Sequence, residues 1–222
     1  MSARLVVLLS GRGTNFSALQ RAILDGWLSA SIVAVVADRP AAGLELAAEH
    51  GIDRVLIDRR RHADRNSFEE SLASALASYQ PDWIVLAGFM RVLSAELVRR
   101  FAGRMVNIHP SLLPLYRGLD THARALAAGD REHGASVHFV TPELDGGPVI
   151  SQVRTPILAG DDVDSLAGRL LALEHRLLPA TMALLSACPV ELRHESIVID
   201  HQPLARPLEL GRDLDEYGRR TR

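Results

Sequence analysis

Two side chains near the middle of the chain could do acid–base chemistry together. Asn107 and His109 are separated by one residue at the end of a short predicted strand, residues 105–108, so both point to one face, about 6–7 Å apart. An amide donor beside an imidazole that titrates near neutrality suits acyl transfer, in which an oxyanion needs a donor and an attacking amine loses a proton. The alternative is structural, with both side chains only satisfying backbone groups at the strand end.

A candidate carboxylate partner lies in a distant loop. Asp145 directly precedes Gly146-Gly147-Pro148, and the two glycines would let this loop approach the strand ends closely. If Asp145 meets His109, its charge favours the imidazolium and fixes the orientation of the ring. By contrast, Asp161 and Asp162 precede a long predicted helix, so we expect them to cap it.

The turn after the first predicted strand is a candidate anion site. Its backbone N–H groups around Gly13 and the dipole of the following helix favour negative charge, and Thr14 and Asn15 add side-chain donors. It fails as a dinucleotide fingerprint, because Phe16 occupies the third glycine position. Asp38 ends the second strand as a ribose-binding acid would, so NAD binding stays open. A single phosphate fits better, and a tight turn that caps a helix is the structural alternative.

The composition excludes several kinds of chemistry. All 25 basic residues are arginine, which rules out a Walker phosphate loop, a pyridoxal Schiff base and any lysine nucleophile. The single cysteine, Cys188, rules out an internal disulfide framework and a cysteine-based zinc site. Four scattered histidines lack the spacing of metal ligands: His50, His62, His194 and His201. We therefore expect no metal.

Charge and hydropathy indicate what kind of partner to expect. The 25 basic residues against 27 acidic ones give a net charge of −2, so nothing favours nucleic acid or an anionic membrane. The apolar runs are too short to span a bilayer, and the first residues do not form a signal peptide. A cytoplasmic protein with small-molecule substrates is expected. The sequence does not determine the oligomeric state, and a homodimer is one candidate.

Alternating strands and helices would position these groups. Buried strands are predicted at residues 5–9, 32–37, 55–57, 83–87 and 105–108, and helices at 16–24, 41–50, 68–79, 94–101 and 165–186. This order predicts an α/β fold: a doubly wound, mainly parallel Rossmann-like sheet with helices on both faces and ligands beyond the carboxyl ends of the strands. Two short strands around residues 137–139 and 149–153 predict a hairpin-like excursion. A small sheet should begin at residue 190, and residues from 211 onward should fray.

Four segments together resemble the phosphoribosylglycinamide formyltransferase family. They are Ser10-Gly11-Arg12-Gly13-Thr14-Asn15, residues 85–91, residues 107–114 and residues 132–148. The resemblance implies the formyltransferase fold and transfer of a formyl group from 10-formyltetrahydrofolate to the amine of glycinamide ribonucleotide in purine biosynthesis. It implies one domain over residues 1–222, with a nucleotide-phosphate-binding half (1–109), a folate-binding and catalytic half (110–190) and a C-terminal extension (191–222).

The resemblance also implies roles for individual residues. Asn107 would stabilise the oxyanion, His109 would transfer the proton and Asp145 would support His109. The ribonucleotide would be held by Gly13, Thr14, Asn15 and Glu174. The folate would lie against Met90, Arg91, Val92, Leu93 and the loop of Thr141, Pro142, Glu143, Leu144 and Asp145, with Arg65 at its glutamate tail.

Several points stay open at this stage. His122 and His138 can line the same cleft, but spacing assigns them no function. Arg117 and Asp120 depart from the usual pattern of the family, which affects loop details. The alternatives are a formyltetrahydrofolate hydrolase, a methionyl-tRNA formyltransferase-like enzyme, an NAD-binding oxidoreductase and a non-catalytic nucleotide-binding module.

Overall fold

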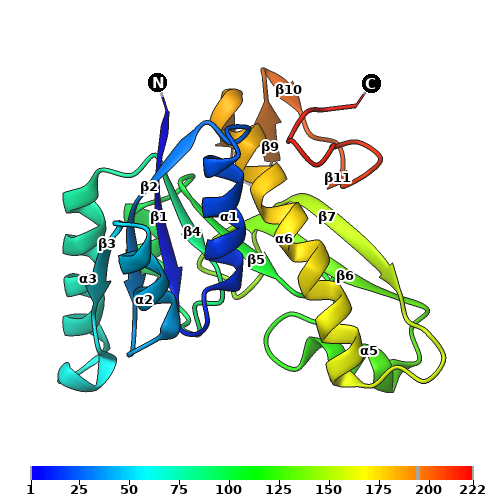
Figure 1. The fold of residues 1–222 in the computed structure, drawn as a ribbon, viewed down its shortest axis with the longest axis horizontal. Coiled ribbons are helices and arrows are strands. Elements are labelled where there is room, and N and C mark those ends of the chain that lie inside the picture. Colours follow the sequence, from blue (N-terminus) through cyan, green and yellow to red (C-terminus); the bar gives the residue numbers. More distant parts are fainter. Residues whose placement is uncertain (1, 194–195, 222) are drawn as a thin grey trace.

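A twisted eight-stranded sheet forms the centre of the computed structural model, which describes residues 2–193 and 196–221 (Figure 1). The strand order is β11-β7-β6-β5-β4-β1-β2-β3. The bounds are β1 (Ala3–Leu9), β2 (Ala30–Ala37), β3 (Asp53–Leu56), β4 (Trp83–Leu86), β5 (Met105–His109), β6 (Glu132–Phe139), β7 (Val149–Pro156) and β11 (Leu208–Glu209). Strands β1 to β5 are parallel, β6 pairs antiparallel with β5 and β7, and β11 is parallel to β7.

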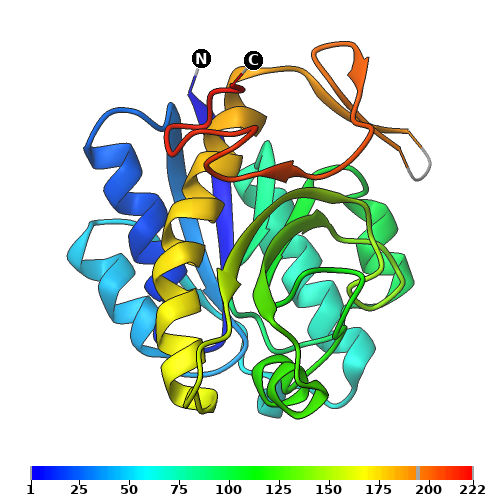
Figure 2. The ribbon, with the colours of Figure 1, turned by 90° about the vertical axis from the view of Figure 1, so that its right-hand side faces the viewer.

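Helices cover both faces of the sheet, as predicted (Figure 2). One face carries α1 (Thr14–Leu24), α2 (Ala42–Glu49) and α6 (Val163–Ala187), and the other carries α3 (Arg65–Tyr79) and α4 (Ala95–Arg100). Burial on both sides explains the continuous apolar run of β1: Leu5, Val7 and Leu9 belong to one core, and Val6 and Leu8 to the other. The fold class is therefore the predicted α/β class.

The capping residues explain where several helices begin. Ser94 accepts a hydrogen bond from the backbone N–H of Leu97 and caps α4. Asp162 forms a capping box with Ser165 at the start of α6. Three further elements were not predicted: the short 3-10 turn η1 (Arg59–Arg61), helix α5 (Thr121–Ala128) and strand β11 at the edge of the main sheet. Helix α5 follows the loop that leaves β5, so it bears directly on the site.

The C-terminal part of the chain is more ordered than expected. A small antiparallel sheet, in the order β10-β9-β8, consists of β8 (Val190–Arg193), β9 (Ser196–Ile199) and β10 (Gln202–Pro203), which confirms the predicted sheet after residue 190. The expected fraying from residue 211 is wrong. Leu214 is fully buried, and the ring of Tyr217 packs edge-on against Trp27 with centroids 5.6 Å apart. These two apolar anchors hold a segment whose other residues are mostly polar.

Candidate active site

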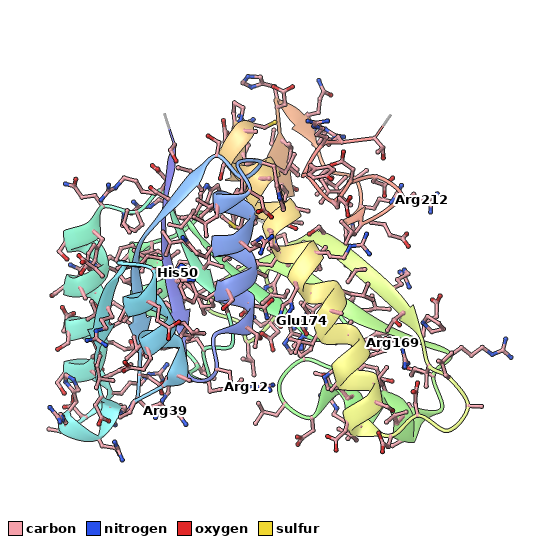
Figure 3. The ribbon with its side chains drawn as sticks, in the orientation of Figure 1. Arg12, Arg39, His50, Arg169, Glu174 and Arg212 are labelled. Atoms are coloured by element: carbon pink, nitrogen blue, oxygen red, sulfur yellow. The ribbon has the colours of Figure 1, made fainter. Side chains whose placement is uncertain are left out.

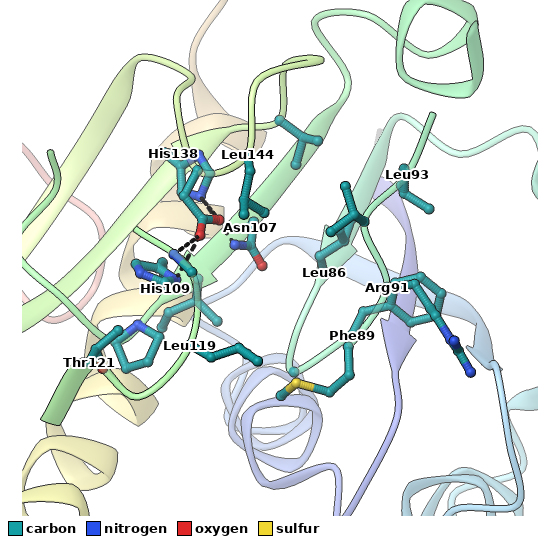
Figure 4. A pocket seen from close by; sticks show the side chains of 18 of the residues that line it. Leu86, Phe89, Arg91, Leu93, Asn107, His109, Leu119, Thr121, His138 and Leu144 are labelled. Carbon is teal, nitrogen blue, oxygen red and sulfur yellow. Dashed lines mark hydrogen bonds and ion pairs between the residues drawn. The ribbon is translucent and has the colours of Figure 1, made fainter. Parts of the chain in front are cut away.

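A cavity of about 700 Å³ opens beyond the carboxyl ends of the central parallel strands β4 and β5 (Figure 4). Its volume suits a small-molecule ligand. Figure 4 shows a polar side, formed by Asn107, His109 and His138, opposite an apolar side with Leu86 and Leu93. The sequence-predicted residues that line it are Asn15, Met90, Arg91, Val92, Leu93, Asn107, His109, Thr141, Pro142, Glu143, Leu144, Asp145 and Glu174.

His109 is held at the end of β5 by contacts at both ring nitrogens. The side chain is buried, and Nε2 lies 3.0 Å from the carbonyl oxygen of Tyr116. Because a carbonyl can only accept, Nε2 must carry a proton and donate it. This leaves Nδ1 as the nitrogen that can gain or lose a proton, and Nδ1 lies 3.5 Å from Oδ2 of Asp145. The two residues therefore meet, although 36 positions of sequence separate them.

Asp145 reaches the strand ends because its loop packs very closely against β6. A Cβ atom on Gly147 would lie 1.9 Å from the carbonyl oxygen of Phe139, so only glycine fits there. Asp145 itself adopts a left-handed backbone conformation, with φ of 47°. The backbone N–H of Gly118 donates to its Oδ2 over 2.9 Å. The glycines thus allow the close approach that the sequence predicted.

The buried His138 orients the amide of Asn107. Nδ1 of His138 donates to the carbonyl of Phe139 over 2.9 Å, so its Nε2 is an acceptor in the neutral ring. Burial lowers the pKa of His138 to about 4, which keeps the ring neutral near pH 7. Nδ2 of Asn107 lies 3.1 Å from that Nε2 and donates one hydrogen to it. The second N–H of Asn107 remains for a ligand in the cavity.

His122 faces the same cavity but contacts another histidine. Its Nδ1 shares a hydrogen bond of 3.0 Å with Nε2 of His133, which is almost fully buried. Burial lowers the pKa of His122, and it lowers the pKa of His133 to about 4. Both rings are therefore neutral near pH 7, and each can satisfy the other. This arrangement places His122 at the cavity without giving it a charge.

The turn before α1, the candidate anion site, and helix α6 meet at one end of the cavity. Gly13 caps α1 with φ of 77°, and a Cβ there would lie 2.8 Å from Cα of Gly43, which explains the glycine. The amide of Asn15 donates to Oε2 of Glu174 over 2.9 Å, and both side chains are buried. Burial raises the pKa of Glu174. Figure 3 shows Glu174 on α6. Asn15 and Glu174 line the cavity, whereas Gly13 and Thr14 are not among its lining residues.

Two residues bear on the dinucleotide alternative, and both argue against it. Phe16 is fully buried in the core beneath α1, where a dinucleotide fold needs glycine. Asp38 is also buried, and its carboxylate binds the guanidinium groups of Arg39 and Arg91 instead of being free for a ribose. Arg65 is not among the lining residues, but it donates to the carbonyl of Val92, which lines the cavity, over 2.9 Å.

Within residues 2–193 and 196–221, no group of three or more His, Cys, Asp or Glu side chains could hold a metal ion. His194 lies outside the described residues. Among the helices of the described part, none is long and apolar enough to cross a membrane.

Comparison with known proteins identifies the family. A family model described as formyl transferase matches residues 3–182. The chain belongs to the formyl transferase family. The phosphoribosylglycinamide formyltransferase of Escherichia coli (strain K12) is 41% identical over 201 residues, which is 90% of this chain and 95% of that protein. The phosphoribosylglycinamide formyltransferase of Coxiella burnetii has a solved structure with a TM-score of 0.90 and 43% identity, covering 94% of this chain and 99% of its own.

A more distant relative has another activity in its name. The formyltetrahydrofolate deformylase of Burkholderia mallei has a TM-score of 0.81 at 28% identity, with 90% of this chain and 70% of that chain covered. The higher identities lie with the formyltransferases, which confirms the resemblance found in the sequence. The chain is an enzyme of the phosphoribosylglycinamide formyltransferase type and acts in purine biosynthesis.

Some groups of the site could not be found by sequence reasoning. The carbonyl of Tyr116 and the N–H of Gly118 hold His109 and Asp145, respectively, yet backbone groups leave no trace in residue type. Tyr116 has φ of 53°, an unusual value for a tyrosine. His138 was noticed, but only its hydrogen bond to Asn107 shows what it does.

Proposed function

We propose that the chain transfers the formyl group of 10-formyltetrahydrofolate directly to the amine of glycinamide ribonucleotide, and that Asn107, His109 and Asp145 carry out the transfer. The observation behind this proposal is that the three side chains share one cavity with the Asn15–Glu174 pair. A hydrogen-bond donor, a proton-transfer group and a carboxylate therefore stand next to a candidate ribonucleotide site. Direct acyl transfer to an amine needs no further group.

The geometry supports a division of work between Asn107 and His109. The amine nitrogen forms the new bond to the formyl carbon, and the π electron pair moves onto the formyl oxygen. The free N–H of Asn107 donates to this oxyanion. The bond to N10 of the folate then breaks, and overall one proton moves from the amine to that nitrogen. Nδ1 of His109 carries the proton, because Nε2 is committed to Tyr116, and Asp145 stabilises the charged ring.

The two ends of the cavity suit the two substrates. The pterin would lie against Met90 to Leu93 and the Thr141 to Asp145 loop, where the lining is largely apolar. At the other end the buried carboxylate of Glu174 would accept hydrogen bonds from the ribose. The phosphate would meet the backbone N–H groups near Gly13 and Thr14 at the start of α1.

The remaining parts of the proposal concern the folate tail and the location. Arg65 would bind the glutamate carboxylates of the folate, because Glu69 and the carbonyl of Val92 hold its guanidinium next to a segment that lines the cavity. Residues 1–109 then contribute the phosphate turn, the Met90 to Leu93 segment, Asn107 and His109, residues 110–190 contribute the Thr141 to Asp145 loop and Glu174, and residues 191–222 form an extension. The enzyme would act in the cytoplasm, since both substrates are charged molecules that do not cross membranes unaided.

Incubation with 10-formyltetrahydrofolate tests this proposal. Release of tetrahydrofolate should require glycinamide ribonucleotide and should yield one formylated amine per folate. Release at the same rate in water alone would instead assign the deformylase activity named for the Burkholderia mallei relative. His109→Ala should retain the fold and reduce the transfer at least ~10²-fold, which is typical when a positioned acid–base group is removed.

A further inference from the structure

A fully buried serine follows His109 and bonds across the loop that leaves β5. The side chain of Ser111 is 0% exposed, and its Oγ lies 2.6 Å from the carbonyl oxygen of Leu115. Because a carbonyl can only accept, the hydroxyl group donates this hydrogen bond. The backbone N–H of Ser111 donates to the carbonyl of His109 over 2.9 Å. Ser111 is not among the residues that line the cavity, so any effect on the reaction must pass through its neighbours.

A buried network fixes the position of Ser111 itself. Oγ of Ser136, on β6, donates to the carbonyl of Ser111 over 2.7 Å and accepts the backbone N–H of Leu113 over 3.0 Å. Nε2 of Gln152, on β7, donates to the same Oγ over 2.9 Å and to the carbonyl of Leu113 over 3.0 Å. The side chains of Ser136 and Gln152 are both buried. The sheet therefore holds Ser111 in place, and its hydroxyl group can fix the loop beyond it.

The loop that this serine fixes contacts two residues of the site. The carbonyl of Tyr116, the residue after Leu115, accepts from Nε2 of His109 over 3.0 Å. The N–H of Gly118 donates to Oδ2 of Asp145 over 2.9 Å. Tyr116 has φ of 53°, a left-handed conformation that a tyrosine keeps only where surrounding contacts hold it. The hydrogen bond at Leu115 holds the peptide unit directly before this residue.

The position of the Tyr116 carbonyl decides which nitrogen of neutral His109 carries the proton. With the carbonyl 3.0 Å away the proton stays on Nε2, and Nδ1 keeps the lone pair that can accept a proton. Oδ2 of Asp145 is the competing acceptor, but at 3.5 Å from Nδ1 it is farther away than in a normal hydrogen bond. If the carbonyl moves away, the proton can shift to Nδ1, where it points at Asp145 and blocks proton transfer.

We propose that Ser111 is a positioning residue for formyl transfer: its hydroxyl group holds the carbonyl of Tyr116 so that neutral His109 keeps its proton on Nε2. The inference rests on the proposed function, in which Nδ1 of His109 carries the proton of the reacting amine. It extends that function to a residue outside the cavity, because the hydrogen bond from Ser111 to Leu115 precedes the carbonyl that His109 needs.

Nitrogen NMR of the histidine rings tests the inference in the absence of substrate. Long-range 1H–15N spectra distinguish a ring nitrogen that carries hydrogen from one that does not, and comparison with His109→Ala identifies the signals of His109. In the wild type, at a pH at which His109 is neutral, Nε2 should carry the proton. Loss of one neutral hydrogen bond changes an equilibrium about twofold to tenfold, so Ser111→Ala should shift the ratio of the two tautomers toward Nδ1 by that factor.

Steady-state kinetics on the same variants link the tautomer to the reaction. Ser111→Ala should lower kcat about twofold to tenfold and leave both KM values within about twofold, because Ser111 does not line the cavity. Ser111→Cys is the milder variant if Ser111→Ala does not fold, since its thiol is a weaker donor of similar shape. It should give smaller changes of the tautomer and of kcat.

Ser151→Ala is the matched control. Ser151 is also fully buried, and its Oγ shares a hydrogen bond of 2.5 Å with Oγ1 of Thr181, between β7 and α6. The variant should keep the wild-type tautomer of His109 and the wild-type kcat. An equal tautomer shift in this control would mean that loss of any buried hydroxyl group disturbs His109, and would overturn the inference.

The outcomes separate this inference from the proposed function. A folded Ser111 variant that loses activity but keeps the wild-type tautomer overturns the inference, as does a wild-type ring with its proton on Nδ1. A shifted tautomer with wild-type kcat would instead refute proton transfer through Nδ1 of His109, which is the step of the proposed function on which the inference rests.

Discussion

Replacement of His138 by leucine should lower the rate of formyl transfer through its effect on Asn107. His138 accepts one hydrogen of the Asn107 amide at 3.1 Å and is 2% exposed, so leucine removes the acceptor and keeps a buried side chain of similar size. Without this contact the amide of Asn107 is free to turn its oxygen toward the formyl group. An oxygen in that place would repel the oxyanion instead of stabilising it.

The structure sets the size of this effect. A neutral hydrogen bond is worth about 0.5–1.5 kcal/mol, so its loss should redistribute the amide orientations and lower kcat about tenfold. Complete loss of the donor, as in Asn107→Ala, should lower kcat about 10²–10³-fold, as for other oxyanion donors. His138→Leu should therefore lie between the wild type and Asn107→Ala. The KM for glycinamide ribonucleotide should change little, because the ribose site is elsewhere.

Steady-state kinetics with three variants separate orientation from simple damage. His138→Gln should recover part of the rate, since its side-chain oxygen can accept the Asn107 hydrogen. Adding His138→Leu to Asn107→Ala should cost nothing further, because His138 acts through Asn107. Circular dichroism confirms folding in each case. A folded His138→Leu enzyme with kcat within twofold of the wild type would refute this reasoning, as would a full additional loss in the double variant.

Three further predictions concern other contacts of the site. Glu174→Gln should raise the KM for glycinamide ribonucleotide about tenfold with little change in kcat, since a buried charged acceptor becomes neutral; an unchanged KM would contradict the ribose assignment. Arg117 pairs with Glu143, which lines the cavity, so Arg117→Glu should lower kcat/KM about twofold to fivefold and the added Glu143→Arg should restore it. Failure of the exchange to restore activity would exclude the pair. Burial lowers the pKa of His133 and of His138 from 6.5 to about 4. Their contribution to the free energy of unfolding should therefore be constant above pH 6.5 and fall by at most about 3 kcal/mol per histidine as the pH drops to 4. Denaturant titrations that show no such decrease would contradict their burial.

Much of the fold follows from local patterns in the sequence. The continuous apolar run of β1 predicts a strand buried on both faces, and the structure places its residues in two cores. The order of strands and helices then predicts the parallel sheet and the edge where ligands bind. The prediction that the chain frays from residue 211 is wrong. The order of residues 211–221 depends on long-range contacts, such as Tyr217 on Trp27, which no local pattern reports.

The candidate site likewise contains groups that the sequence could identify and groups that it could not. Side chains with distinctive chemistry, such as Asn107, His109 and Asp145, could be named from the sequence, and the structure brings them into one cavity. The backbone groups that hold them could not, because the carbonyl of Tyr116 and the N–H of Gly118 depend on the path of the loop. Asp38 shows the reverse case: its position suggested a ribose ligand, but two arginines from other parts of the chain occupy its carboxylate.

A double-mutant cycle on His109 and Asp145 tests most directly whether the two side chains work as one unit. The single variants His109→Ala and Asp145→Ala and the double variant are compared by kcat for formyl transfer under identical conditions. Because Asp145 is proposed to act through the ring 3.5 Å away, the double variant should lose about as much activity as His109→Ala alone. Losses that multiply in the double variant, or single variants that keep near wild-type turnover, would contradict the account.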